Sequence, residues 1–266
     1  MDHLSGLPRD KDDKSDRKFI EALARGLDVL RAFQPGDGFL GNQDIAVRTG
    51  LPKSSISRIT FTLTKLGYLT YSDRLEKYQL GSGVLALGYA FVSNLAIRQV
   101  AKPLMQELAN STGTSVGLAD RDRLDMIYVE HCAPVNVTAF RYEIGDKIPM
   151  AQSSSGRGYL AALSQEERDY LLGHVQRKAG EDWQGIKSGI DEAIECYLQR
   201  GFCHSFGDWD RDVNGISVPL VIGQNNIFTF SAGGPAYRLS PEFLQHEVAP
   251  MLKNLVRNVE ATLIRY

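Results

Sequence analysis

Residues 153–158, SSSGRG, have side chains and a spacing that suit a chemical role. They precede the helix-forming segment RGYLAAL, so this loop leads into the N-terminus of a helix. The first N–H groups of a helix have no partner inside it, and beside hydroxyls they suit a carboxylate or a phosphate. The alternative is a flexible turn with a serine N-cap. A dinucleotide site is excluded, because Gly156 and Gly158 lack the third glycine and a preceding βαβ unit.

A second candidate is the segment 52–65, which places small hydroxyls and cations on one helical face. No acidic residue stands between Asp44 and Asp73, although the whole chain has a net charge of −2. A helix free of acidic side chains can enter the major groove of DNA and contact base edges and phosphates. The alternative is an ordinary solvated helix. We predict that the DNA contacts come from Arg48, Lys53, Ser54, Ser55, Ser57, Arg58 and Thr62.

The segment DWDRDVNG imitates the start of a calcium-binding loop. Asp210, Asp212 and Asn214 have the spacing of an EF-hand. Val221 stands at the twelfth position, where a bidentate Glu is needed, so calcium binding is not predicted.

The histidines and cysteines do not form an evident metal site. The pairs His131/Cys132 and Cys203/His204 lie on strand-like stretches, where adjacent side chains point to opposite faces. Neither pair can therefore chelate zinc by itself. The nucleophile motif GxSxG is absent, and no residue stands out as an activated nucleophile. We predict no catalytic residue, no metal ligand and no cofactor.

Three helices would position the segment 52–65. An apolar helical face is predicted in 19–33 by Ile20, Leu23, Leu27 and Leu30. A short helix follows over 42–50, with Asn42 as its N-cap. Pro52 fits the first turn of the third helix. The buried stripe of that helix is predicted to consist of Ile56, Ile59, Leu63 and Leu66.

Two short β-prone runs, 68–71 and 77–80, come next around a polar turn and predict a hairpin. Three helices, a tight turn before the third helix and a hairpin indicate a winged helix-turn-helix over residues 19–81. The first 95 residues carry 13 Lys and Arg against 11 Asp and Glu, whereas the remainder carries 17 against 21. The local charge therefore agrees with a DNA-binding N-terminal domain.

Residues 82–96 form the next predicted helix. Its apolar face consists of Val84, Leu87, Gly88, Phe91 and Leu95. Such a face either packs on its own domain or joins two subunits. We predict dimerisation, because a small DNA-reading unit gains affinity by pairing half-sites of a pseudo-palindromic operator.

The remainder, 97–266, mixes helices and strands without strict βαβ alternation, which predicts an α+β domain. It begins with a helix over 97–113. Strand-like runs occur at 114–120, 124–130, 135–143, 215–223 and 227–234. Helical patterns occur at 166–175 and 186–200, and the chain closes on a helix with Leu244, Val248, Leu252, Leu255 and Val259 in register.

The first 18 residues alternate in charge and contain few large apolar groups, which predicts a disordered tail. They lack the apolar segment of a signal peptide, and no apolar run in the chain approaches the ~18 residues of a membrane span. Three scattered cysteines do not make a disulfide framework. We therefore expect a cytoplasmic protein without a membrane partner.

Several motifs, taken in order, resemble the IclR (isocitrate lyase regulator) family of transcriptional regulators. They are ARGLDVLRAF, GLPKSSISRI with LTKLGYL, YQLGSGVLALG, and GDKIPMAQSSSGRGYLA. The resemblance covers nearly the whole chain from about residue 19. It implies a winged helix-turn-helix, a dimerising linker helix, and a GAF-like C-terminal domain that binds a small organic acid. It also implies that the protein forms a homodimer or a dimer of dimers, which is a homotetramer.

The resemblance further implies where the effector binds. The residues that fall in the family's effector region are Met150, Ser153, Ser154, Ser155, Gly156, Asp208, Val213, Gly215 and Ser231. Two positions depart from the family pattern. Asp212 stands where the family has a glycine, and Gly215 stands where it has a small Cys or Ser.

Two classes of function compete on the sequence. One is a transcriptional regulator, a repressor or an activator, that responds to an effector and controls a catabolic operon. The other is a small-molecule sensor or enzyme whose N-terminal domain only mediates protein contacts. We favour the regulator. Aromatic residues near the expected pocket are compatible with a flat, apolar acid. The alternative is that most of them are core residues: Tyr128, Phe140, Tyr142, Phe206, Trp209 and Phe230.

Overall fold

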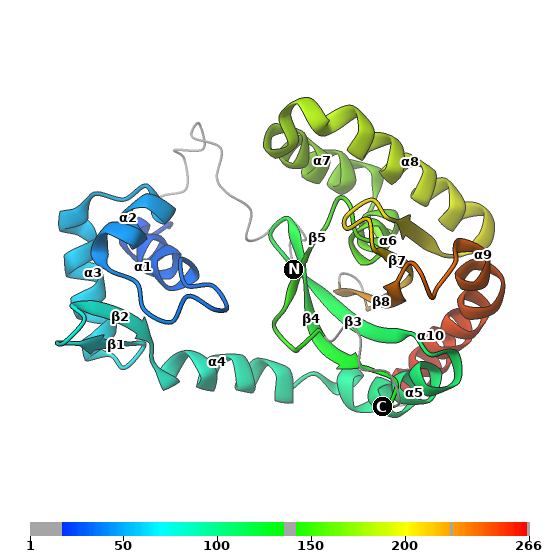
Figure 1. Ribbon diagram of the computed structural model, residues 1–266, viewed down its shortest axis with the longest axis horizontal. Helices are drawn as coiled ribbons and strands as arrows, with labels where there is room; N and C mark the ends of the chain where they lie inside the picture. The colour runs from blue at the N-terminus through cyan, green and yellow to red at the C-terminus, as the bar shows by residue number, and fades with distance from the viewer. Residues whose placement is uncertain (1–17, 136–141, 224–225, 265–266) are drawn as a thin grey trace. The chain divides into compact units, whose positions relative to one another are not determined.

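The computed structural model of the chain describes residues 18–135, 142–223 and 226–264. Contacts divide it into two compact units, which meet in the sequence between Asn94 and Leu95 (Figure 1). The predicted disordered tail lies almost wholly outside the described residues, as does Phe140. Each unit is described by itself below.

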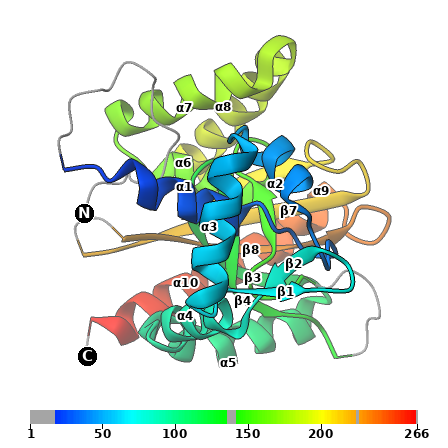
Figure 2. The same cartoon turned by 90° about the vertical axis from the view of Figure 1, so that its left-hand side faces the viewer.

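The first unit contains three helices, α1 (Glu21–Arg31), α2 (Asn42–Thr49) and α3 (Lys53–Lys65). The strands β1 (Leu69–Ser72) and β2 (Lys77–Leu80) pair antiparallel and form the wing. Figure 2 shows α3 beside this hairpin. The small core is made mainly of Val29, Leu40, Ile45, Ile56, Leu63 and Leu69. The predicted winged helix-turn-helix is confirmed.

Details of the three helices differ from the prediction. Gly41, not Asn42, is the N-cap of α2, because the Asp44 carboxylate accepts a hydrogen bond from the Gly41 N–H at 2.9 Å. Pro52 is the N-cap residue of α3 and precedes its first turn. Leu66 lies just beyond α3 and is 64% exposed, so it does not extend the buried stripe.

Most of the apolar face predicted for α1 points away from the core of the first unit, although Leu30 packs against that core. Ile20, Leu23 and Leu27 are exposed, and the buried residue of this helix is Val29. The helix α4 (Ser82–Ser93) follows the wing and contains no buried residue at all. Its large exposed apolar side chains are Leu85, Leu87, Tyr89 and Phe91. The first unit therefore presents two apolar helical faces to its surroundings.

The second unit is built on one antiparallel six-stranded sheet of order β5-β4-β3-β8-β7-β6. The strands are β3 (Ser115–Asp122), β4 (Asp125–Cys132), β5 (Lys147–Pro149), β6 (Cys203–Phe206), β7 (Val213–Ile222) and β8 (Asn226–Pro235). One predicted strand, 135–143, is only partly described; Val135, Tyr142 and Glu143 are not in a strand. The strand that pairs with β4 at this edge of the sheet is instead β5, from the short segment KIP.

Helices cover both faces of this sheet. Figure 1 shows α5 (Ala96–Thr112) and α10 (Ala249–Leu263) on one face, and α6 (Ser154–Ala162), α7 (Gln165–Ala179) and α8 (Trp183–Arg200) on the other. A short helical turn, η1 (Gly180–Asp182), lies between α7 and α8. Two more, α9 (Pro241–Phe243) and η2 (Leu244–Val248), lie between β8 and α10. The predicted α+β domain is confirmed. No single helix among the described residues is long and apolar enough to cross a membrane; α4 and α5 meet that test only when taken together.

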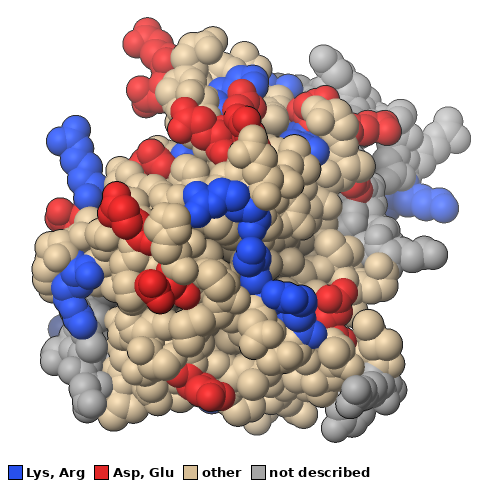
Figure 3. All heavy atoms as spheres, turned by 90° about the vertical axis from the view of Figure 1, so that its right-hand side faces the viewer, with Lys and Arg blue, Asp and Glu red and all other residues tan. Residues whose placement is uncertain are grey.

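The two faces of the sheet differ in chemistry. The larger core lies between the sheet and α5 and α10, and strand residues such as Val116, Leu118 and Phe230 belong to it. The other face carries small and polar residues beside a smaller core under α6 and α8. On the surface that Figure 3 shows, Lys and Arg side chains are interspersed with Asp and Glu.

Candidate functional site

The helix α3 presents most of the predicted DNA contacts to solvent. Gly50 ends α2 with φ +68°, a left-handed conformation that favours glycine and allows the tight turn into α3. Lys53, Ser54, Ser57, Arg58 and Thr62 are exposed, and Ser55 is half-buried. The Asn42 amide donates to the Ser57 hydroxyl at 3.2 Å, which links the two helices of the motif.

Arg48 differs from the other predicted contacts, because its guanidinium is engaged within the unit. It forms hydrogen bonds of 2.5 and 2.9 Å with the Asp37 carboxylate and one of 2.8 Å with the Ala32 carbonyl. The hydrogen bond from Arg48 lowers the pKa of Asp37. Arg48, on α2, thus holds the loop between α1 and α2 in place. Its contact with DNA stays a prediction.

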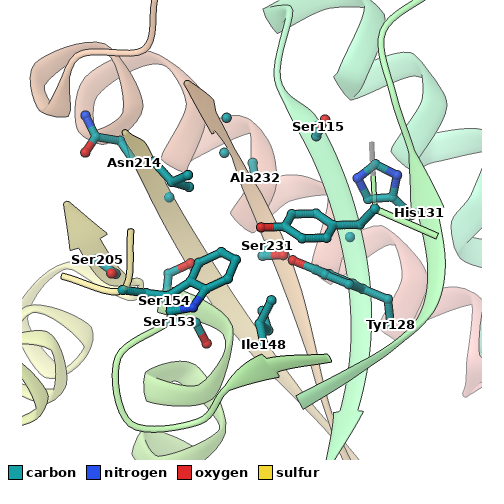
Figure 4. A pocket seen from close by; sticks show the side chains of 17 residues that line it. Ser115, Tyr128, His131, Ile148, Ser153, Ser154, Ser205, Asn214, Ser231 and Ala232 are labelled. Atoms are coloured by element: carbon teal, nitrogen blue, oxygen red, sulfur yellow. The ribbon is translucent and has the colours of Figure 1, made fainter. Parts of the chain in front are cut away.

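In the second unit a cavity of about 50 Å³ lies over the polar face of the sheet (Figure 4). Its floor is a row of residues that face one another across neighbouring strands. His131 on β4 pairs with Gly117 on β3, and Gly117 pairs with Ser231 on β8. An added Cβ at Gly117 would meet the Tyr128 ring at 2.2 Å, so glycine is required where this ring crosses the floor.

A β-bulge determines which side chains of β4 face the cavity. Leu118 pairs with Glu130 and Ala119 pairs with Tyr128, so Val129 is the extra residue. Without the bulge, residues 128 and 131 would point to opposite faces, because side chains alternate along a strand. The bulge shifts that alternation by one residue. Both Tyr128 and His131 therefore line the cavity.

The N-terminus of α6 forms one wall of the cavity. The Ser153 hydroxyl accepts a hydrogen bond from the Gly156 N–H at 3.1 Å and caps the helix. This leaves the N–H groups of Ser154 and Ser155 without a partner inside the helix. The Ser154 carbonyl accepts from the Ser217 hydroxyl at 2.5 Å, which fixes the loop above β7. Ser153 can thus cap the helix while the N–H groups of the next two residues remain available to an anion. The two interpretations of this loop do not exclude each other.

The structure brings five of the nine predicted effector residues together at the cavity. They are Ser153, Ser154, Val213, Gly215 and Ser231. Gly215 provides room for the loop, since an added Cβ would meet the Ser154 hydroxyl at 3.0 Å.

Three of the other four predicted residues support the loop from behind. Ser155 is buried, with its hydroxyl 2.5 Å from that of Thr229. Gly156 packs on the backbone of Met150, where an added Cβ would come within 2.0 Å. Met150 itself is fully buried. These contacts fix the loop in place without lining the cavity.

The fourth of these residues, Asp208, pairs with a buried arginine. The side chain of Arg157 is 2% exposed and donates to the Asp208 carboxylate at 2.7 Å. It also donates to the carbonyl of His204 at 3.0 Å. Asp208 precedes Trp209, which lines the cavity, so this ion pair holds the loop that carries the indole.

Aromatic side chains form the remaining wall. Tyr142 lies between Tyr128, at a ring-centroid distance of 5.0 Å, and Trp209, at 6.1 Å. Burial raises the pKa of Tyr128 to about 12 and also raises that of Tyr142, so both phenols are uncharged at neutral pH. The other described aromatic candidates, Phe206 and Phe230, do not line the cavity.

Several lining residues were not predicted from the sequence, among them Ser115, Gly117, His131 and Asn214. Asn214 had been considered only as part of the calcium-like segment, and His131 only as part of a zinc pair. Among the described residues no group of three His, Cys, Asp or Glu side chains could hold a metal ion. His131 lines the cavity while Cys132 belongs to the core on the opposite face.

Comparison with known proteins assigns the two units to one family. Residues 22–73 match the IclR helix-turn-helix domain, and residues 89–261 match the domain described as "Bacterial transcriptional regulator IclR C-terminal". The chain belongs to the IclR family. Proteins of this family are transcriptional regulators that bind DNA through the helix-turn-helix, and its curated members similar to this chain are regulators rather than enzymes.

Individual IclR relatives resemble the chain over nearly its full length. It is 30% identical over 247 residues to the HTH-type transcriptional regulator TsaQ1/TsaQ2 of Comamonas testosteroni, covering 92% of this chain and 88% of the relative. A crystal structure of an IclR family regulator from Brucella abortus has a TM-score of 0.89 and 44% identity, covering 97% and 98%. An IclR homologue from Microbacterium hydrocarbonoxydans, complexed with 4-hydroxybenzoate, shares the fold with a TM-score of 0.70 and 23% identity, covering 92% and 100%.

Proposed function

We propose that this IclR regulator changes its operator affinity when a small aromatic acid binds in the cavity of the second unit. The main observation behind the proposal is that one cavity is lined both by a helix N-terminus, which suits an anion, and by a wall of aromatic side chains. The N–H groups of Ser154 and Ser155 suit a carboxylate, because a helix N-terminus is partially positive. Ser231 offers a further hydroxyl on the floor.

The aromatic part of the acid would lie against the rings of Tyr128, Tyr142 and Trp209. Aromatic rings prefer offset or edge-on contacts at centroid distances of roughly 4.5–7 Å, and the rings of this wall already have such spacings. Val213, at the start of β7, would contribute a further apolar contact. The complex of the Microbacterium homologue with 4-hydroxybenzoate is consistent with a ligand of this class.

We further propose that the DNA-binding species is a dimer, or a dimer of dimers, that reads a pseudo-palindromic operator. The exposed apolar faces of α1 and α4 support this proposal, since both belong to the DNA-binding unit. Exposed apolar patches of this kind mark protein–protein contacts. A two-fold dimer places its recognition helices at half-sites one helical turn, or a multiple of it, apart.

Calorimetry and thermal shift with benzoate and other aromatic acids test the effector site. An acid that binds only the folded state raises its apparent stability. In Ser154→Leu the apolar side chain would occupy the space at the helix N-terminus, and we expect acid binding to be lost while operator binding remains. The matched control is Ser188→Leu, on α8 and away from the cavity. Undiminished acid affinity in Ser154→Leu would place the effector elsewhere.

A further inference from the structure

The cavity has a second polar end, opposite the anion-binding loop. Ser154 lies above β7, whereas His131 belongs to β4, and the strands β3 and β8 separate them. Three strand spacings amount to roughly 14 Å along the sheet. Figure 4 shows His131 on one side of the cavity and Ser153 and Ser154 on the other. One aromatic ring with a hydrogen bond at each end can bridge such a gap.

His131 holds a buried nitrogen to which none of the described residues forms a hydrogen bond. Its Nε2 atom is shielded from solvent and has no hydrogen-bond partner among the described residues. The imidazole lies 5.8 Å from the Tyr128 ring and 5.9 Å from the Tyr142 ring, measured between centroids. Buried polar atoms are nearly always hydrogen-bonded in folded proteins. An unpaired one in the wall of a ligand cavity therefore indicates a partner atom on the ligand.

The charge at this end of the cavity restricts what that partner can be. Burial lowers the pKa of His131, although the carboxylates of Asp146 and Glu130 oppose this shift, so the imidazole is neutral at neutral pH. Glu130 lies on the opposite face of β4, paired with Arg98 and Lys102. No Lys or Arg is among the described residues that line the cavity. A second carboxylate would be buried there without a cation, which is costly.

Resting on the effector site proposed above, we infer that His131 determines specificity: its Nε2 hydrogen-bonds an uncharged hydroxyl at the end of the acid remote from the carboxylate. The effector is then a hydroxylated aromatic acid, preferred over the bare acid and over the diacid. A neutral imidazole nitrogen can donate to or accept from a hydroxyl, according to its tautomer.

The test is calorimetry on the full chain with benzoate, 3-hydroxybenzoate, 4-hydroxybenzoate and terephthalate. The better hydroxybenzoate should bind roughly 3- to 10-fold more tightly than benzoate, the range for one net hydrogen bond. His131→Phe keeps a ring and removes the nitrogen, so it should bring this ratio close to one. His131→Gln restores a polar atom and should recover part of the preference. The matched control is His246→Phe, at an exposed position outside the cavity.

The outcomes separate this inference from the effector proposal. Equal binding of benzoate and both hydroxybenzoates to the wild type, or a preference retained in His131→Phe, overturns the role of His131 but leaves the site in place. Loss of benzoate binding in a folded His131→Phe makes the imidazole a structural part of the cavity and also overturns it. Terephthalate as the tightest ligand contradicts the charge argument. Failure of every acid to bind the wild type overturns both proposals.

Discussion

At Gly117 one methyl group is enough to alter the cavity. An added Cβ would lie 2.2 Å from the Tyr128 ring and 3.1 Å from the Ser231 hydroxyl. In Gly117→Ala the ring must therefore shift, which disturbs its hydrogen bond with Ser231. We expect a loss of about 1–3 kcal/mol in the free energy of unfolding, as in other overpacked sites, and loss of acid binding. Denaturant unfolding and calorimetry measure the two effects.

A matched glycine provides the control for this change. Gly173 lies within α7, and an added Cβ there would meet no atom within 4 Å. Gly173→Ala should raise stability by about 0.5–1 kcal/mol and leave acid binding unchanged, because alanine is the better helix former. Normal acid affinity in Gly117→Ala would show that the Tyr128 ring is free to move without consequence.

Two exposed residues of α3 are expected to act differently on DNA. Lys53→Ala should weaken specific and non-specific binding alike and reduce the slope of log K against log salt by about one, since one phosphate contact is lost. Arg58→Ala should instead cost about 1–3 kcal/mol of discrimination between operator and non-operator DNA. Fluorescence anisotropy over a salt series distinguishes the two, with Lys178→Ala in the second unit as the control. Wild-type binding by both variants would refute the assignment of α3 to the groove.

At the scale of secondary structure, the helix α4 presents an exposed apolar face. Leu87 is 60% exposed and Phe91 is 48% exposed, on a helix with no buried residue. We expect the double variant Leu87→Asp/Phe91→Asp to convert the proposed dimer to a monomer, because the introduced charges oppose the burial of this face. Sedimentation should show the change in mass, and operator affinity should fall because one half-site is lost. Leu198→Asp, on the exposed face of α8, is the control. A wild-type monomer with full operator affinity would contradict the dimer.

The apolar stripes show how far periodicity alone can predict an element. The spacing of Ile20, Leu23 and Leu27 correctly indicated the helix α1, but these side chains are exposed and Val29 fills the core. A stripe at helical spacing looks the same whether it packs on its own core or on another surface. Periodicity therefore predicts that a helix forms and that one face is apolar, but not what covers that face.

The strands show the corresponding limit for the candidate site. The loop at Ser153 and Ser154 was predictable, because its residue types and its position before a helix are local features. The approach of His131 to Gly117 and Ser231 was not, because it depends on the register between β3 and β4 and on the pairing of β3 with β8, which lies far along the chain. The bulge at Val129 further changes which side chains face the cavity. Neither the register nor the bulge has a signature that can be read from one strand.

For the whole molecule, control by an effector requires a free-energy coupling between the two units. An acid changes operator affinity only if it binds the DNA-competent and DNA-released forms differently. The coupling is typically about 1–3 kcal/mol, or roughly 5- to 150-fold in affinity. Operator DNA must change the acid affinity by the same factor, which calorimetry with and without operator can measure. Unequal factors at equilibrium would mean that the acid acts on a further linked equilibrium, such as assembly.

The separation of the sheet into two chemically different faces has a consequence for how such a protein can change over generations. On β3 Leu118 belongs to the larger core while the adjacent Gly117 lines the cavity, and on β8 the same holds for Phe230 and Ser231. A substitution on the floor leaves the larger core on the opposite face untouched. New effectors can thus be acquired by point mutations on the floor while the larger core stays packed.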